Sequence, residues 1–298
     1  MSHRIDIKVG YSCNNHCIFC VQGDKRSRIG DKSHKEVLSI LEKRRRDNNE
    51  VVFTGGEVTI RDDFFVLLRR AAKLRYDVIQ VQSNGRMFAY EEFCEKAVKA
   101  GANSFALALH GSTKKVHDLL TRVPGSFDQT VRGIGNLKKL KQKVLLNTVV
   151  TKANYKDLPR IAELLVSMSV DQFQFAFVHI CDTLAGNRGL VKEIVARKSM
   201  VEKYVKKGLQ TGIDSNIPVM AEALPYCFMK GYEQYISDRF IPPTSIEETF
   251  FTENYEKARK EEDKMKGPRC AACASNNVCE GPWKEYPAIF GWEEFKPV

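Results

Sequence analysis

The feature that most constrains the fold is a regular alternation of strand-like and helix-like segments through the first 200 residues. Short stretches rich in β-branched and aromatic residues alternate with longer amphipathic ones. We predict strands at 4–10, 51–54, 78–82, 104–109, 143–150 and 173–180, and helices at 33–46, 61–74, 91–101, 126–141, 158–168 and 199–210. Strands separated by helices pair in parallel, and right-handed crossovers wrap them into a barrel. The predicted fold class is therefore α/β, a partial (β/α)6 TIM-like barrel.

Two of the predicted helices begin with a capping signal. Ser33 is followed three residues later by Glu36, and Ser126 is followed three residues later by Gln129. A Ser side chain can accept a hydrogen bond from the first-turn amides, and the Glu or Gln can return the bond. We therefore expect both serines to be N-caps.

The alternation fades after about residue 200, and we place a domain boundary near residue 210. Residues 1–210 would form the barrel, and residues 211–298 a small C-terminal domain without a clear strand–helix repeat. This second part contains four of the nine cysteines: Cys227, Cys270, Cys273 and Cys279.

Unusual polar motifs follow several of the predicted strands. A cysteine-rich loop follows the first, Gly55-Gly56-Glu57 the second, Ser83-Asn84 the third and His110 the fourth. Active sites in parallel α/β folds lie at the carboxyl ends of the strands. The sequence therefore predicts that these motifs share one site.

The loop after the first strand reads CNNHCIFC, with Cys13, Cys17 and Cys20 at spacings of four and three. Three thiolates in one short loop can hold three irons of a cubane and leave the fourth iron open for chemistry. The alternative is a zinc loop with His16 as fourth ligand. His16 directly precedes Cys17, which makes tetrahedral ligation by both side chains cramped.

The overall composition indicates a reducing compartment and an acidic partner. There is no signal peptide and no long apolar run, so we expect a cytoplasmic chain with free thiols and no membrane association. The net charge of +10 favours nucleic acid, an acidic peptide or an acidic electron donor. The basic run at residues 43–46 is more typical of a solvated helix end than of a functional patch.

The Cys13-x3-Cys17-x2-Cys20 loop, with an aromatic residue, Phe19, before the last cysteine, resembles the signature of the radical S-adenosylmethionine (SAM) family. The resemblance extends over residues 4 to about 190 and includes the TGGE motif at the end of the second strand. It implies a [4Fe–4S] cluster whose open iron binds SAM. Reductive cleavage of SAM would then give a 5′-deoxyadenosyl radical that abstracts hydrogen from a substrate.

The same resemblance implies a set of SAM contacts, for which plain structural roles remain as alternatives. Glu57 and the backbone of Gly55 and Gly56 would accept from the SAM ammonium, and Arg122 would bind its carboxylate. The further candidates are Phe19, Ser83 and Asn84 for the nucleoside and Asn147 facing the cavity. At the fourth strand, many family members have Ser-Leu-Asp-Gly, whereas this chain has Ala-Leu-His-Gly. His110 is therefore either a buried neutral side chain or a substrate contact.

The C-terminal cysteines resemble the auxiliary-cluster extension of the family, called twitch in its short form and SPASM in its long form. Four cysteines with one CxxC pair suit a second [4Fe–4S] cluster, with zinc or unrelated thiols as alternatives. Whether Cys227 is a ligand is open. Of the remaining two, Cys94 is expected in the core, and Cys181 is either a hydrogen donor to a substrate radical or a buried small side chain.

These observations favour a radical SAM enzyme that acts on a peptide or a small molecule, with an auxiliary cluster that aids oxidation or substrate binding. Bond formation and epimerisation are further outcomes. An RNA-modifying enzyme is a weaker hypothesis, because the basic charge is diffuse and no RNA-binding module is visible. A non-catalytic iron–sulfur carrier is a third, although it needs no nucleoside pocket. The basic surface and the need for low-potential electrons predict an acidic flavodoxin or ferredoxin as reductant.

Overall fold

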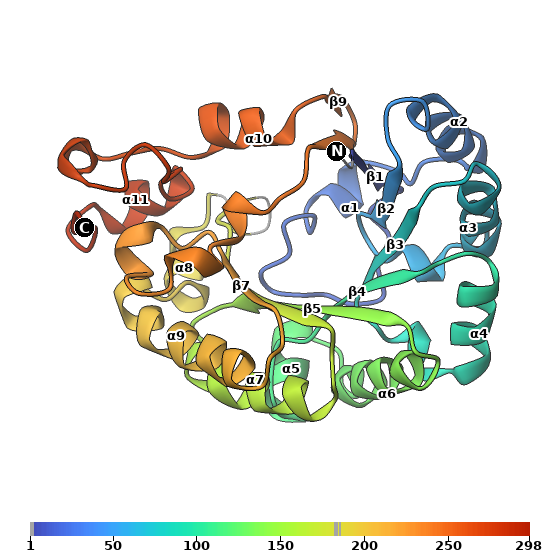
Figure 1. The fold of residues 1–298 in the computed structure, drawn as a ribbon, viewed down its shortest axis with the longest axis horizontal. Coiled ribbons are helices and arrows are strands. Elements are labelled where there is room, and N and C mark those ends of the chain that lie inside the picture. The colour runs from blue at the N-terminus through green and yellow to red at the C-terminus, as the bar shows by residue number, and fades with distance from the viewer. Residues whose placement is uncertain (1–2, 182–183, 185) are drawn as a thin grey trace.

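The computed structural model describes residues 3–181, 184 and 186–298. One curved sheet of nine strands organises the chain, in the order β7-β6-β5-β4-β3-β2-β1-β8-β9 (Figure 1). All neighbouring pairs are parallel except the antiparallel pair β8–β9. The strands are β1 Arg4–Lys8, β2 Glu50–Thr54, β3 Val78–Ser83, β4 Ser104–Ala108, β5 Lys143–Val150, β6 Gln172–Phe177, β7 Val219–Glu222, β8 Thr244–Glu247 and β9 Phe251–Thr252.

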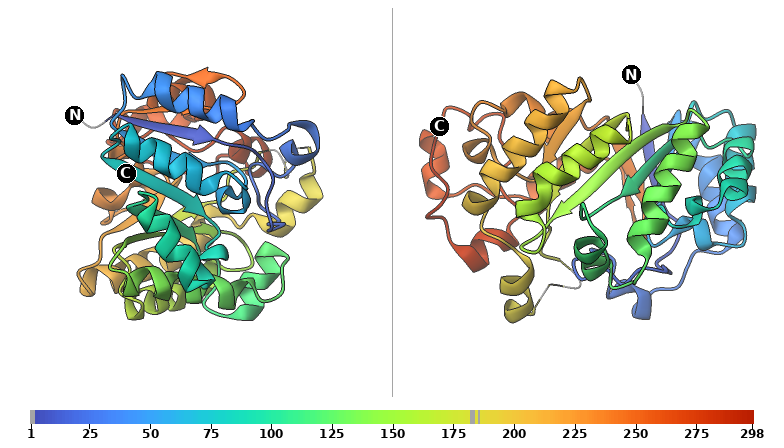
Figure 2. Two further views of the ribbon diagram at one scale, coloured as in Figure 1. Left: turned by 90° about the vertical axis from the view of Figure 1, so that its right-hand side faces the viewer. Right: turned by 90° about the horizontal axis from the view of Figure 1, so that it is seen from below.

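The larger helices lie along the outer side of this sheet, and its concave side forms the inside of an open barrel (Figure 1). The C-terminal segment with α11 lies beside α8 and α9, at the end of the sheet formed by β7 (Figures 1 and 2). The helices are α1 Lys25–Arg28, α2 His34–Arg44, α3 Phe64–Lys73, α4 Glu91–Lys99, α5 Lys114–Thr121, α6 Ser126–Lys139, α7 Leu158–Ser167, α8 Arg188–Ile194, α9 Lys198–Asp214, α10 Tyr255–Ala258 and α11 Glu285–Phe290.

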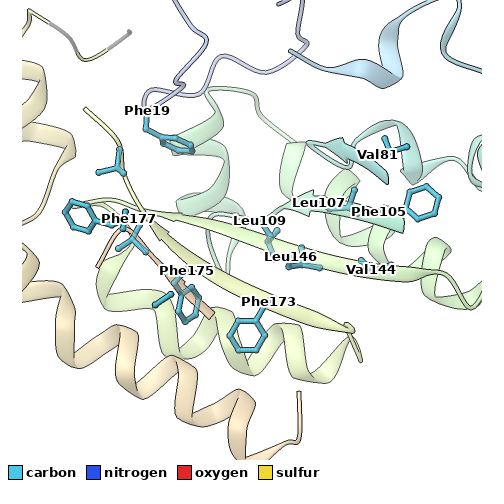
Figure 3. Packing of buried hydrophobic residues seen from close by; sticks show 14 of the residues in the cluster. Phe19, Val81, Phe105, Leu107, Leu109, Val144, Leu146, Phe173, Phe175 and Phe177 are labelled. Carbon is cyan, nitrogen blue, oxygen red and sulfur yellow. The ribbon is translucent and has the colours of Figure 1, made fainter. Parts of the chain in front are cut away.

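Alternation along the strands separates the two faces of the sheet. In β6, Phe173 and Phe175 are buried on the side that faces the helices, as Figure 3 shows, whereas Gln172 and Gln174 are partly exposed. Because side chains alternate between faces, the polar residues of β6 lie on the concave side. The apolar face packs the barrel together, and the polar face is left for ligands.

The predicted partial barrel is confirmed, but the sequence reading missed three strands. All six predicted strands are present within a few residues of their expected limits. The strands β7, β8 and β9 are only two to four residues long and carry no extended alternation. Residue 210 lies inside α9, and all three missed strands join the barrel sheet. The sheet therefore continues across the expected boundary near residue 210. The division into residues 1–210 and 211–298 stays a prediction.

One of the two predicted caps is present. Ser33 and Glu36 form a reciprocal capping box at the start of α2, as predicted. The prediction for Ser126 is wrong, because the N-cap of α6 is Gly125 in a left-handed conformation. The Asp118 carboxylate of α5 takes the capping role, since it accepts from Gly125 N–H at 2.7 Å and from Phe127 N–H at 2.8 Å. The first-turn N–H groups of α6 are thus satisfied by a carboxylate of the preceding helix instead of by the Ser126 hydroxyl.

In the part of the chain that the structure describes, no helix is both long enough and apolar enough to cross a membrane.

Candidate functional site

The cysteine-rich loop runs from the end of β1 to α1 and is held by backbone hydrogen bonds to the end of α5. His16 N–H donates to Thr121 O at 2.9 Å, and Ile18 N–H donates to Leu120 O at 3.1 Å. At the entrance to the loop, Tyr11 N–H donates to the Asp31 carboxylate at 2.6 Å. These contacts fix the path of a segment that has no regular secondary structure of its own.

The three thiols of the loop lie in a setting that suits thiolate ligands. Asn15 N–H donates to Cys13 Sγ and Gln22 N–H to Cys20 Sγ, each at 3.4 Å. The Arg26 guanidinium lies 3.8 Å from Cys20 Sγ. Burial, together with the neighbouring thiols Cys20 and Cys13, raises the pKa of Cys17 to about 12. Three thiols that repel one another as anions need a cationic partner, which an iron–sulfur cluster provides.

A zinc site with His16 does not fit this geometry. The His16 side chain is exposed. Among the residues with described positions, no three His, Cys, Asp or Glu side chains converge on a single metal ion. A cubane spreads its cysteine ligands over several irons, so it does not require such convergence.

The two glycines after β2 bring this turn into direct backbone contact with the cysteine loop. Gly56 N–H donates to Gly10 O at 2.7 Å, and Glu57 N–H donates to Ser12 O at 2.8 Å. A Cβ on Gly55 would lie 2.3 Å from Gly10 O, and a Cβ on Gly56 would lie 2.1 Å from Ser12 O. Gly55 also has a φ of +119°. Only glycine permits this approach.

The Glu57 carboxylate is buried and already accepts four hydrogen bonds. Thr59 donates its N–H at 3.1 Å and also its hydroxyl, Ser83 Oγ donates at 2.8 Å, and Asn84 N–H donates to Oε2 at 2.7 Å. Burial raises the pKa of Glu57, and these donors act in the opposite direction. Three of these bonds go to Oε1 and one goes to Oε2, so Oε2 keeps an acceptor position. Glu57 therefore joins the turn after β2 to the end of β3, and its contact with the SAM ammonium stays a prediction.

Asn84 connects the end of β3 to the cysteine loop. Its Nδ2 donates to Asn14 Oδ1 at 2.6 Å and lies 4.0 Å from Cys13 Sγ. The sequence reading missed Arg86, whose Nη1 reaches Asn15 Oδ1 at 3.0 Å. In the sequence, the one feature that could have indicated a role for Arg86 is its position two residues after Asn84. Both side chains therefore shape the loop, and the Ser83 hydroxyl is committed to Glu57.

His110 is a buried side chain packed directly against the cysteine loop. Its ring meets Phe19 edge-on at a centroid distance of 4.8 Å and stacks on His117 at 5.8 Å. Val149 N–H donates to His110 Nδ1 at 3.2 Å, which places the imidazole proton on Nε2. Burial, together with the neighbouring His117, lowers the pKa of His110 to about 3. Of the two roles left open, the structure favours the buried neutral side chain.

The remaining candidate residues lie on different elements of the barrel. Arg122 is exposed and follows directly after Leu120 and Thr121, the two residues whose carbonyls hold that loop. Asn147 lies on the concave face of β5, where its Oδ1 accepts from Gln174. Cys181 is partly buried and lies four residues beyond the end of β6. Cys94 is fully buried, as expected for a core residue.

Glu248, which the sequence reading did not single out, connects the end of β8 to both sides of the cysteine loop. Its carboxylate accepts from Lys25 Nζ at 2.8 Å and Tyr11 OH at 3.0 Å, and it lies 2.8 Å from Lys8 Nζ. Burial alone would raise the pKa of Glu248, but Lys25 and Lys8 together lower it to about 2. A segment late in the sequence thus anchors the strand before the loop and the helix after it.

The four C-terminal cysteines line one cavity. Cys227, Cys270, Cys273 and Cys279 face it together with the cationic side chains of Lys266, Arg269 and Lys296. Burial raises the pKa of Cys227 to about 12, with the charges of Cys279, Cys270 and Cys273 adding to the effect. Although 42 residues separate Cys227 from Cys270, the fold brings it to the other three.

A buried ion network adjoins this cavity. Arg259 donates to both oxygens of Glu280 at 2.7 and 2.6 Å, and Lys264 Nζ lies 2.7 Å from Asp238 and 2.8 Å from Glu280. Arg259 and Lys264 are both at most 5% exposed. Glu280 directly follows Cys279, so the network fixes the backbone beside this cysteine.

This fold and cysteine arrangement match a known family. The sequence profile of the radical SAM superfamily matches residues 7–165, more than half of the chain, and the chain belongs to this superfamily. It is therefore an enzyme that uses a [4Fe–4S] cluster and SAM.

Named relatives cover the barrel but differ in their activities. The chain is 28% identical over 161 residues to an AdoMet-dependent heme synthase of Oleidesulfovibrio alaskensis, which covers 52% of this chain and 41% of the relative. It is 27% identical over 179 residues to a probable GTP 3′,8-cyclase of Saccharolobus solfataricus, which covers 58% of this chain and 56% of the relative. The chain thus spans about half of the length of the curated relatives it matches.

Solved structures match a larger part of the fold. SuiB of Streptococcus suis bound to S-adenosylmethionine has a TM-score of 0.68 at 15% identity, covering 95% of this chain and 73% of that one. SuiB bound to the precursor peptide SuiA gives 0.67 at 16% identity, with 95% and 72% covered. Native anSMEcpe with bound AdoMet gives 0.60 at 18% identity, with 73% and 64% covered. At these identities the similarity establishes the fold, including the C-terminal segment in the case of SuiB.

Proposed function

We propose that the chain cleaves SAM reductively and abstracts hydrogen from a peptide or small-molecule substrate, with Cys13, Cys17 and Cys20 as cluster ligands. Reductive cleavage of SAM at the reduced cluster supplies the 5′-deoxyadenosyl radical. The proposal rests on one observation above all: the turn Gly55-Gly56-Glu57 and the end of β3 both bond to the backbone or side chains of the cysteine loop. A nucleoside bound at these strand ends lies next to the loop.

In this proposal some residues hold the cysteine loop in place, and others contact SAM directly. Glu57, Ser83 and Asn84 support the loop, because their polar groups bond to one another and to Asn14. The exposed Arg122 guanidinium is the group that binds the SAM carboxylate, since a guanidinium matches the fork geometry of a carboxylate. Phe19 supplies an apolar wall that His110 holds in position from behind.

We further propose that Cys227, Cys270, Cys273 and Cys279 hold a second [4Fe–4S] cluster. All four thiols line one cavity, which supports a full set of four protein ligands rather than an open iron. Such a closed cluster serves electron transfer, so it favours an oxidative reaction in which a substrate radical loses an electron. Cys181 remains the candidate hydrogen donor if the reaction instead returns a hydrogen atom.

The substrate class that we favour is a peptide. This choice is supported by the fold similarity to SuiB, a structure of which contains a precursor peptide. A basic chain also attracts an acidic flavodoxin or ferredoxin as reductant.

The experiment that tests the proposal combines metal analysis with SAM cleavage. After anaerobic reconstitution we expect about eight irons per chain, falling to about four in a Cys270/Cys273/Cys279→Ala variant. Dithionite should produce 5′-deoxyadenosine from SAM in the wild type, and Cys17→Ala should abolish this product. Cys94→Ala is the matched control, since it removes a core thiol and should change neither quantity.

About four irons in both the wild type and the triple variant would remove the second cluster from the proposal. Full iron content without any SAM cleavage under strong reductant would revive the iron–sulfur carrier hypothesis.

A further inference from the structure

The concave face of β5, β6 and β7 carries a ladder of three polar side chains. Gln174 Nε2 donates to Asn147 Oδ1 and to Glu222 Oε2, each at 3.0 Å. The three residues belong to adjacent strands, with Asn147 in register with Gln174 and Glu222 two residues beyond Met220, the register partner of Gln174 in β7. All three are partly exposed rather than buried. Their second polar atoms, Glu222 Oε1 among them, therefore remain available to a ligand.

Glu222 differs from the charges on the opposite side of the concave face, which are paired. In β1, Arg4 and Asp6 form an ion pair at 2.7 Å, and Lys8 lies 2.8 Å from Glu248. Glu222 has no Lys, Arg or His within ion-pair distance among the residues with described positions. Burying a carboxylate without a cation costs free energy. We therefore expect the unpaired Glu222 carboxylate, which lies next to the expected substrate position, to bind a cationic group.

The ion network behind Glu222 does not supply that partner. Arg259 and Lys264 act on Glu222 only at longer range, because their own hydrogen bonds go to Glu280 and Asp238. Three carboxylates (Glu222, Asp238 and Glu280) thus share these two cations, and burial together with the charge of Asp238 raises the pKa of Glu222. Of these three carboxylates, Glu222 is the one that accepts a hydrogen bond from Gln174 on the concave face.

Two other side chains that face Glu222 are also engaged elsewhere. The His179 ring stacks on Trp283 at a centroid distance of 4.2 Å, and its Nε2 lies 3.4 Å from the Glu285 carboxylate. Tyr255 of α10 interacts electrostatically with both Glu222 and Asp6, and it contributes no positive charge. Lys198 of α9 is a third cation near β7, but its Nζ donates to Ala223 O at 2.7 Å rather than to Glu222, and burial lowers its pKa. Among the residues with described positions, the elements packed against β7 therefore provide no ion pair for Glu222.

From this geometry we infer that Glu222, with Gln174 and Asn147, forms a substrate subsite that binds a cationic hydrogen-bond donor, an ammonium or guanidinium group. The inference rests on the proposed function, because it places the substrate on the concave face of the barrel. It also reassigns Asn147 from cofactor binding to substrate binding. Glu222 Oε1 and Gln174 Oε1 accept from the cation, and Glu222 compensates its charge.

The test measures binding of n-butylguanidinium and of its neutral isostere n-butylurea to the reconstituted protein by isothermal titration calorimetry. We expect n-butylguanidinium to bind the wild type, and Glu222→Gln to weaken this binding about tenfold through loss of the charge pair. n-Butylurea should not distinguish the two proteins. Glu247→Gln is the matched control, since Glu247 is already paired with Arg44 at 2.8 Å and should leave n-butylguanidinium binding unchanged.

A second variant keeps the test decisive if Glu222→Gln fails to fold. Asn147→Asp retains the acceptor for Gln174 and adds a negative charge, so it should tighten n-butylguanidinium binding about threefold. No binding to the wild type, equal binding to Glu222→Gln, or no gain in Asn147→Asp would each overturn the inference.

Formation of 5′-deoxyadenosine by the wild type is measured separately and reports on the proposed function alone. Failure of the subsite is thus distinguishable from failure of the radical chemistry.

Discussion

Replacing Glu57 with Gln separates two roles for this carboxylate, a support inside the chain or a direct ligand of SAM. In the best orientation the new amide keeps its oxygen where Thr59 and Ser83 donate. Its NH2 group then faces Asn84 N–H, which now donates to Oε2 at 2.7 Å. One buried N–H loses its acceptor, which costs about 1–3 kcal/mol, and the other hydrogen bonds lose their charged partner.

We therefore expect Glu57→Gln to destabilise the protein by about 2–3 kcal/mol, equivalent to a fall in Tm of about 3–5 °C for a chain of this size. The assay is thermal unfolding of the reconstituted protein without SAM, followed by circular dichroism under anaerobic conditions. Glu256→Gln is the control, because Glu256 is an exposed partner of Lys260 within α10 and the following turn. Such a pair contributes at most about 1 kcal/mol.

The SAM affinity of the same variant decides between the two roles. A support predicts a lower Tm in the absence of SAM and a secondary loss of affinity. An unchanged Tm combined with a large loss of SAM affinity would refute the reasoning and make Glu57 a direct contact of the SAM ammonium.

Three further predictions follow from contacts described above or adjacent to them. Gly56→Ala should prevent cluster assembly, because its Cβ would lie 2.1 Å from Ser12 O, whereas Gly30→Ala, which has no atom within 4 Å, should keep full iron content. Asp118→Ala should cost about 1–2 kcal/mol in urea unfolding, because the first turn of α6 loses its acceptor; an unchanged midpoint would contradict this. Lys198 is fully buried, donates to Ala223 O at 2.7 Å and lies 3.4 Å from the centre of the Phe177 ring. Burial lowers the pKa of Lys198, so the unfolded chain binds more protons between that lowered pKa and about 10.4, and stability should rise with pH over this window. Urea unfolding at several pH values should show this slope in the wild type and lose it in Lys198→Met.

The barrel was predictable because its strands repeat a simple physical pattern. In β6, buried phenylalanines alternate with polar residues, and a helix of ordinary length follows at each step. The same logic placed Cys13, Gly56 and Asn84 at strand ends, and the structure brings all three together.

The parts that could not be predicted depend on contacts between distant segments. The strand β8 has only four residues, and its partner β1 lies about 240 residues earlier, so neither local pattern nor length identifies it. The hydrogen bonds of Glu57 come from the turn after β2 and from the end of β3, so its motif alone could not show which donors it would meet. In the same way, nothing in the spacing from Cys227 to Cys270 shows that they face one cavity.

The contact of Glu248 with both sides of the cysteine loop has a consequence for how the protein is made. Lys8, Tyr11 and Lys25 leave the ribosome more than 200 residues before their shared partner. Until β8 emerges, the β1 edge is open to pairing with other strands, and the loop lacks one of its anchors. Release of a chain cut near residue 210 should therefore yield a barrel with an exposed edge and a tendency to aggregate. We therefore expect stable cluster insertion to require the chain through β8.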